Sequence, residues 1–133
     1  MPEHRMLLVE PADMLRRTVS LTARSLGMDA IDEAATLPQA QRLLRERRYA
    51  GAVIAIDSDG TPDLTLLDQV RGGQTASDAA IPIAVLAAQA NPDFIEALRG
   101  RDVRRVILKP FRARVLLETF VAMGAAGAAA PPP

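Results

Sequence analysis

The sequence predicts an α/β fold, a doubly wound five-stranded parallel sheet of the (βα)5 type. Two observations carry this prediction. Short apolar runs of strand length alternate with helical patterns five times within the first 123 residues. The run 52–56 is unbroken Ala-Val-Ile-Ala-Ile, as is typical of a strand buried on both faces. Such alternation favours a single open sheet that is joined by right-handed crossovers and covered by helices on both faces.

The first two strands are predicted at 6–9 and 30–34, where short apolar or mixed runs occur. The helix between them is expected to begin near Pro11, because a proline suits the first helical turn, and to end at Gly27. The 3.6-residue period predicts that its inward face contains Leu15, Val19 and Leu26.

The second helix is expected to begin near Pro38 and to precede the buried strand 52–56. The segment 57–62 has the composition of a loop, and 72–75 is expected to end the third helix. The inward residues of these two helices are expected to be Ala40, Leu43, Leu44, Leu64, Leu66, Leu67 and Val70.

The fourth strand is predicted at 81–86 and the fifth at 106–108. Asn91 and Pro92 form an N-cap and first turn for the helix that lies between them. The last helix is expected to bury Val115, Leu116, Phe120 and Met123.

The composition indicates one domain, which we expect to span residues 1–123 and to be followed by a flexible Ala/Gly/Pro tail or linker at 124–133. The 16 acidic residues balance the 16 basic ones, so no strong field attracts nucleic acid or an anionic membrane. Cysteine is absent, which excludes disulfides and thiolate metal sites. No apolar run approaches the roughly 20 residues needed to cross a bilayer. A cytoplasmic location is therefore expected.

Candidate site residues follow from the fold, because ligands bind beyond the carboxyl ends of the strands in open parallel sheets. Lys109 is the only lysine in the chain and lies at the end of the fifth predicted strand. Its ammonium is a compact point charge that suits a small anionic site. The residues at the other strand ends are Glu10, Pro11, Asp57, Ala87 and Ala88.

At these positions the chain resembles the receiver domain of two-component response regulators (CheY-like). The resemblance covers about residues 5–123 and agrees with the predicted (βα)5 order. It rests on the segments 7–10, 49–71, 81–88 and 109–111.

The resemblance implies a role for each strand end. In the family, a carboxylate pair after the first strand holds Mg²⁺, an aspartate ending the third strand accepts a phosphoryl group, and a Ser or Thr and a Lys bind that group. Here Glu10 and Lys109 keep the family's chemistry, whereas Pro11, Ala55 and Ala87 replace the second carboxylate, the acceptor and the hydroxyl. The family's switch aromatic, three residues before the lysine, is Val106.

These losses predict a degenerate receiver, or pseudo-receiver, of bacterial type. Mg²⁺ prefers an octahedral shell of oxygens, so we expect weak or no Mg²⁺ binding and no other cofactor. Phosphoryl transfer depends on positioning and charge neutralisation, so losing the acceptor together with the metal ligand should abolish it. The predicted function is a phosphorylation-independent interaction module of two-component, phosphorelay-associated signalling, and not an enzyme.

Three alternatives remain at the level of sequence. Asp57 or Asp59 is an unusual phosphoryl acceptor in one of them, although two residues displace a carboxylate by roughly 6.5 Å along a strand. In the second, the arginines sense a small anion such as a nucleotide second messenger. In the third, Lys109 forms a structural ion pair with Glu10 or Asp57.

The predicted interaction surface is built from the fourth helix, the fifth strand and the fifth helix. Arginines crowd this third of the chain, and arginine is enriched at protein interfaces. We expect a histidine kinase, another regulator or a second copy of the chain to bind here, and neither nucleic acid nor membrane. The residues of this surface are Phe94, Leu98, Arg99, Arg101, Arg104, Arg105, Arg112 and Arg114.

Overall fold

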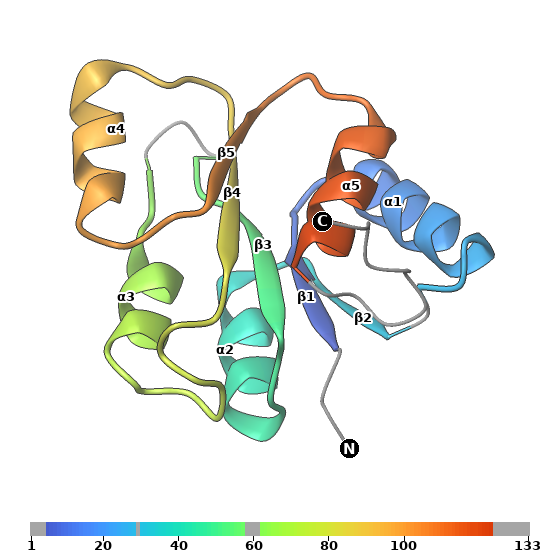
Figure 1. The fold of residues 1–133 in the computed structure, drawn as a ribbon, viewed down its shortest axis with the longest axis horizontal. Coiled ribbons are helices and arrows are strands. Elements are labelled where there is room, and N and C mark those ends of the chain that lie inside the picture. Colours follow the sequence, from blue (N-terminus) through green and yellow to red (C-terminus); the bar gives the residue numbers. More distant parts are fainter. Residues whose placement is uncertain (1–4, 29, 58–61, 124–133) are drawn as a thin grey trace.

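The computed structural model describes residues 5–28, 30–57 and 62–123. Five parallel strands form one sheet in the order β2-β1-β3-β4-β5, and a helix follows each strand along the chain (Figure 1). The predicted doubly wound α/β sheet is therefore confirmed. The strands are β1 (Met6–Val9), β2 (Ile31–Ala34), β3 (Gly51–Ala55), β4 (Ile83–Ala87) and β5 (Arg105–Leu108). The predicted tail at 124–133 lies outside the described residues.

The helices divide between the two faces of the sheet. Figure 1 shows α1 and α5 on one side and α2, α3 and α4 on the other. Side chains alternate accordingly: Leu7 and Val9 pack toward α2 and α3, whereas Met6 and Leu8 pack toward α1 and α5. The helices are α1 (Asp13–Ser25), α2 (Leu37–Glu46), α3 (Thr65–Arg71), α4 (Pro92–Arg99) and α5 (Ala113–Ala122).

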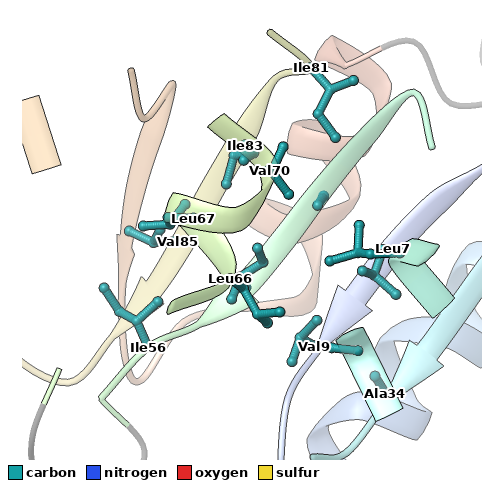
Figure 2. Close-up of a cluster of buried hydrophobic side chains, with 14 of the residues drawn as sticks. Leu7, Val9, Ala34, Ile56, Leu66, Leu67, Val70, Ile81, Ile83 and Val85 are labelled. Carbon is teal, nitrogen blue, oxygen red and sulfur yellow. The ribbon is translucent and has the colours of Figure 1, made fainter. Parts of the chain in front are cut away.

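The larger apolar core lies under α2, α3 and α4. Figure 2 shows Leu66, Leu67 and Val70 of α3 packed over Ile83 and Val85 of the sheet. The opposite core is closed by α1 and α5, where Phe120 is fully buried. Both faces of β3 are thus covered, as its unbroken apolar sequence predicts.

The ends of the helices follow local chemistry. The Thr36 hydroxyl accepts a hydrogen bond from the backbone N–H of Gln39 at 3.2 Å, and the Asn91 side chain accepts one from Phe94 at 2.9 Å. Gly27 has a φ of +88°, in the left-handed region that favours glycine after a helix. Because α1 ends at Ser25, the predicted inward residue Leu26 is exposed, and that prediction is wrong.

Arg71 at the end of α3 holds two loops together. Its guanidinium donates hydrogen bonds of 2.7–2.9 Å to the backbone carbonyls of Ala79, Ile81, Arg101 and Asp102. Burial lowers the pKa of this side chain below its usual range. The contacts fix the loop before β4 against the loop between α4 and β5.

Candidate functional site

A cavity of about 360 Å³ opens at the carboxyl edge of the sheet. It lies where β1, β3, β4 and β5 end, which is the position expected for ligand sites in open parallel sheets. Five of the residues named from the sequence at the strand ends come together here. The lining consists of Glu10, Pro11, Ala12, Asp57, Ala88 and Lys109.

Glu10 and Lys109 form the charged centre of this cavity. Glu10 directly follows β1 and is only 1% exposed. Its Oε1 lies 2.5 Å from the Lys109 Nζ, which makes an ion pair, although the alignment is not that of a hydrogen bond. Its Oε2 accepts a hydrogen bond from the backbone N–H of Ala12 at 3.0 Å. The structural ion pair considered from the sequence is therefore present, and Glu10 is its partner.

The position of Lys109 follows from the pairing of β5. Its backbone N–H donates to the carbonyl of Ala87 at 2.9 Å, so the residue continues the β4–β5 ladder by one step. A cis peptide bond to Pro110 follows. The ammonium therefore points from the tip of the last strand into the cavity that Glu10 lines.

Asp57 also lines the cavity, as its place among the strand-end residues predicts. The spacing along an extended strand places it roughly 6.5 Å beyond Ala55. However, β3 ends at Ala55, and the Asp57 side chain is 8% exposed beside Ala88. Both of its carboxylate oxygens accept hydrogen bonds from the Ala88 N–H at 2.8–2.9 Å, and Oδ2 lies 3.3 Å from the N–H of Gln89.

Two further residues that the sequence placed at this site, Ala55 and Ala87, are apolar and do not line the cavity. Ala87 is fully buried within β4 and presents no hydroxyl. Ala55 lies outside the charged cavity and lines a neighbouring hollow of about 300 Å³ with Pro11, Ile54 and Leu66. Asp59, the second candidate acceptor, lies outside the described residues.

The described side chains do not fit a bound magnesium ion. Among them, no three His, Cys, Asp or Glu residues are grouped so that they could hold a metal. Glu10 is held by Lys109 and Ala12, and the Asp57 oxygens already accept backbone hydrogen bonds. Pro11 adds no oxygen ligand from its side chain, whereas Mg²⁺ requires an octahedral oxygen shell.

The predicted interaction surface contains arginines in two different situations. Four of them contact neighbouring side chains: Arg99 contacts Glu96, Arg101 contacts Asp68, Arg105 contacts Thr119 and Arg114 contacts Glu118. Arg104 and Arg112 are exposed, and neither side chain forms an ion pair or hydrogen bond with another residue in the described part of the chain. These two guanidinium groups are the ones most available to a partner.

The apolar anchors predicted for this surface are wrong. Phe94 and Leu98 are buried in the core under α4, because they lie on the face of this short helix that packs against the sheet. They are therefore not available to a partner. Leu108 on β5 is instead a large apolar residue that this surface exposes, at 49% exposure. The sequence places Leu108 in the fifth strand, and the position of that strand at the edge of the sheet gives the residue its exposure.

The structure resembles solved receiver domains over nearly its whole length. The chemotaxis protein CheY4 of Vibrio cholerae is 19% identical, with a TM-score of 0.77 over 92% of this chain and 99% of that one. The receiver domain of the sensor histidine kinase PA1611 from Pseudomonas aeruginosa, solved with magnesium coordinated in its active-site cleft, is 21% identical. Its TM-score is 0.72 over 93% of this chain and 100% of that one.

HP1043, an orphan response regulator of Helicobacter pylori, is 16% identical, with a TM-score of 0.71 over 92% of this chain and 98% of that one. The sequence matches no family model and no curated protein. Within the described residues, no helix is long and apolar enough to span a membrane. At these identities the likeness establishes the fold, which is that of CheY-like response regulator receiver domains.

Proposed function

We propose that the chain is a receiver-like module of two-component signalling that acts through protein contacts and is not switched by phosphorylation. The observation that carries this proposal is the Glu10–Lys109 ion pair, in which the lysine that would bind a phosphoryl group is already neutralised by a buried carboxylate. Ala55 and Ala87, which stand where the resemblance expects the acceptor and the hydroxyl, add no oxygen to this site. The module is then neither an enzyme nor a magnesium protein.

The proposed partners are a histidine kinase, another regulator or a second copy of this chain, in the cytoplasm. The proposed contact surface is the face of α4, β5 and α5. Arg104 and Arg112 supply exposed positive charge there, and Leu108 supplies exposed apolar area. Arginine and apolar side chains are the groups from which interfaces are commonly built.

Phosphorylation is tested by incubating the protein with acetyl phosphate and Mg²⁺ and measuring its intact mass. We expect no adduct of about 80 Da, the mass of one phosphoryl group, while an active receiver domain in a parallel reaction acquires one. A stoichiometric adduct on this chain would contradict the proposal.

The second candidate function is phosphoryl acceptance at Asp57. It is favoured by the position of this carboxylate in the same cavity as Lys109. It is opposed by the hydrogen bonds that both carboxylate oxygens already accept from the loop after β4. An adduct on the unmodified chain that disappears in an Asp57→Asn variant would establish this second function in place of the first.

A further inference from the structure

We propose that Asp57 is a permanent internal ligand of the loop between β4 and α4, and that it fixes the start of α4 in one conformation. This inference rests on the proposed function, because it explains how a module without phosphorylation can keep one defined partner face. The loop comprises residues 88–91, between the end of β4 at Ala87 and the start of α4 at Pro92.

The contact joins two segments that are far apart in the sequence. Asp57 follows β3, and its carboxylate accepts hydrogen bonds from the N–H groups of Ala88 and Gln89, 31 and 32 residues later. Hydrogen bonds to an ionised acceptor are roughly twice as strong as those between neutral groups. Asp57 is largely buried, so water screens these bonds only weakly.

The carboxylate also extends the pairing of the two strands. The N–H of Ile56 donates to the carbonyl of Leu86 at 3.1 Å, and the next residue, Asp57, reaches Ala88 through its side chain. A side chain thus replaces the backbone of β3 where the strand has ended. The loop after β4 is thereby attached to the centre of the sheet.

The attachment is close to the beginning of α4. Only Ala90 separates Gln89 from Asn91, whose side chain caps the first turn of this helix by accepting from Phe94 at 2.9 Å. Phe94 is buried, so the direction in which the chain enters α4 determines how the helix packs. Holding Ala88 and Gln89 therefore constrains the α4 side of the proposed partner face.

Asp57 does not form the ion pair of the cavity, so its carboxylate is available to hold the loop after β4. Lys109 lies in the same cavity, but its ammonium pairs with Glu10. Removing the Asp57 charge should therefore release the loop without unpairing Lys109. Asp57→Asn retains the size of the side chain and one carbonyl acceptor, whereas Asp57→Ala removes the acceptor altogether.

The test is residue-resolved amide hydrogen exchange by NMR. In the unmodified protein, the amides of Ala88 and Gln89 should be protected relative to free loop amides, although both residues are exposed. In Asp57→Asn and Asp57→Ala their exchange should accelerate about tenfold or more, as expected when a charge-assisted hydrogen bond is lost. Changes in amide chemical shift in these two variants should extend to Phe94 in α4 and not to Leu116 in α5.

Asp63→Asn is the matched control. Asp63 lies on the same β3–α3 connection, and its carboxylate accepts from the N–H of Thr65, within that connection. Equal acceleration at Ala88 and Gln89 in this control and in Asp57→Asn would overturn the proposal. Unprotected amides in the unmodified protein would also overturn it, even if the variants fail to fold.

The result is distinguishable from the fate of the proposed function. Hydrogen exchange measures the Asp57 contact in protein that has met no phosphodonor, whereas intact mass measures phosphorylation. Unprotected Ala88 and Gln89 amides without any mass adduct would contradict this inference and leave the proposed function intact. Protected amides together with an adduct would remove the proposed function alone.

Discussion

Glu10 gives the single lysine of this chain a structural role. A carboxylate that is only 1% exposed needs a partner, because an unpaired buried charge is strongly unfavourable. Lys109 provides that partner from the tip of β5. A compact ammonium reaches Glu10 inside a small cavity, whereas the broad planar guanidinium of an arginine requires more space. Lys109 thus has a structural role as the partner of Glu10.

The ion pair predicts non-additive effects of mutation. Lys109→Met should lower the free energy of unfolding by about 2–3 kcal/mol, because it leaves the buried Glu10 carboxylate uncompensated. This loss is at or below the lower limit expected for breaking a buried ion pair, because Lys109 is partly exposed. In the Glu10→Gln/Lys109→Met double variant, most of this loss should be recovered. Urea denaturation of the four proteins in the cycle measures the coupling. Simple addition of the two single effects would show that the pair does not stabilise the fold.

Magnesium binding is predicted to be weak at the same residues. Lys109 already neutralises Glu10, and Pro11 lacks a carboxylate, so the ion would find too few free oxygens. In NMR spectra recorded during an Mg²⁺ titration, the amides of Ala12, Ala88 and Lys109 should not shift saturably below millimolar concentrations. The same titration of an active receiver domain is the positive control. Saturable shifts at these amides would contradict the prediction.

At the scale of single residues, the sequence predicted that the residues at the strand ends would lie together. It did not predict which of their side chains would contact one another. The strand ends were expected to converge, and Glu10, Pro11, Asp57, Ala88 and Lys109 do line one cavity. Asp57 was expected at this edge, but too far along the strand to fill the position that Ala55 occupies in the resemblance. Its entry depends on where β3 ends, and a boundary shift of one residue is beyond what propensity resolves.

Among the elements, β2 and β3 are joined at their amino ends by a polar cluster around Asp32. Its carboxylate accepts hydrogen bonds from Arg5 at 3.0 Å, from Arg47 at 3.2 Å and from the Tyr49 hydroxyl at 2.7 Å. Burial, followed by the hydrogen bond and the negative charge of Asp32, raises the pKa of Tyr49 above its usual range. The cluster connects the edge strand β2 to the start of the central strand.

This cluster predicts a loss of stability in alkali that depends on Tyr49. The folded state keeps the Tyr49 phenol protonated at pH values where the unfolded chain ionises. The folded state therefore binds more protons than the unfolded state. The contribution of Tyr49 to the free energy of unfolding is complete below about pH 10, the usual pKa of tyrosine. Above that pH it falls by about 1.4 kcal/mol per pH unit until the pKa of Tyr49 in the folded state is reached.

Tyr49→Phe is the control, because it removes the titrating group and leaves Asp32 paired with both arginines. Its unfolding free energy should decline less steeply above pH 10 than that of the unmodified protein. Tyr49 is the only tyrosine and tryptophan is absent, so ultraviolet absorbance reports its ionisation directly. A phenolate that appears near pH 10 in the folded protein would contradict the prediction.

Element boundaries were predictable where one residue determines them. Asn91 caps α4 as its chemistry indicates, and Gly27, in the left-handed conformation, lies two residues after the end of α1. Strand bounds were less accurate: β4 was expected from Ile81 and begins at Ile83. Pro82 has no N–H to donate, which makes it a poor interior residue of a central strand.

For the whole molecule, the order of elements was sufficient to predict the sheet. Alternating strands and helices with right-handed crossovers leave few arrangements, and the doubly wound one buries the apolar run 52–56 on both faces. The working surface was less predictable, because pairing between side chains depends on tertiary contacts. Arg101 contacts Asp68 and Arg105 contacts Thr119, residues 33 and 14 positions away in the chain.

The last prediction concerns that surface. Arg104→Glu combined with Arg112→Glu should raise the dissociation constant of self-association, or of binding to a cognate kinase, about tenfold, since reversed charges on an interface repel a complementary partner. The melting temperature should change little, because both side chains are exposed and form no ion pair within the described residues. Sedimentation equilibrium measures self-association without requiring a known partner.

Arg45→Glu with Arg48→Glu is the matched control, since these exposed arginines lie on or beside α2, away from the proposed face. It should leave association unchanged, as should the Glu10→Gln/Lys109→Met variant, which alters the cavity and not the surface. If the cavity variant abolishes association while reversal of Arg104 and Arg112 has no effect, the cavity is the working site. The face of α4, β5 and α5 would then have no part in binding, and Lys109 would regain a role beyond its ion pair.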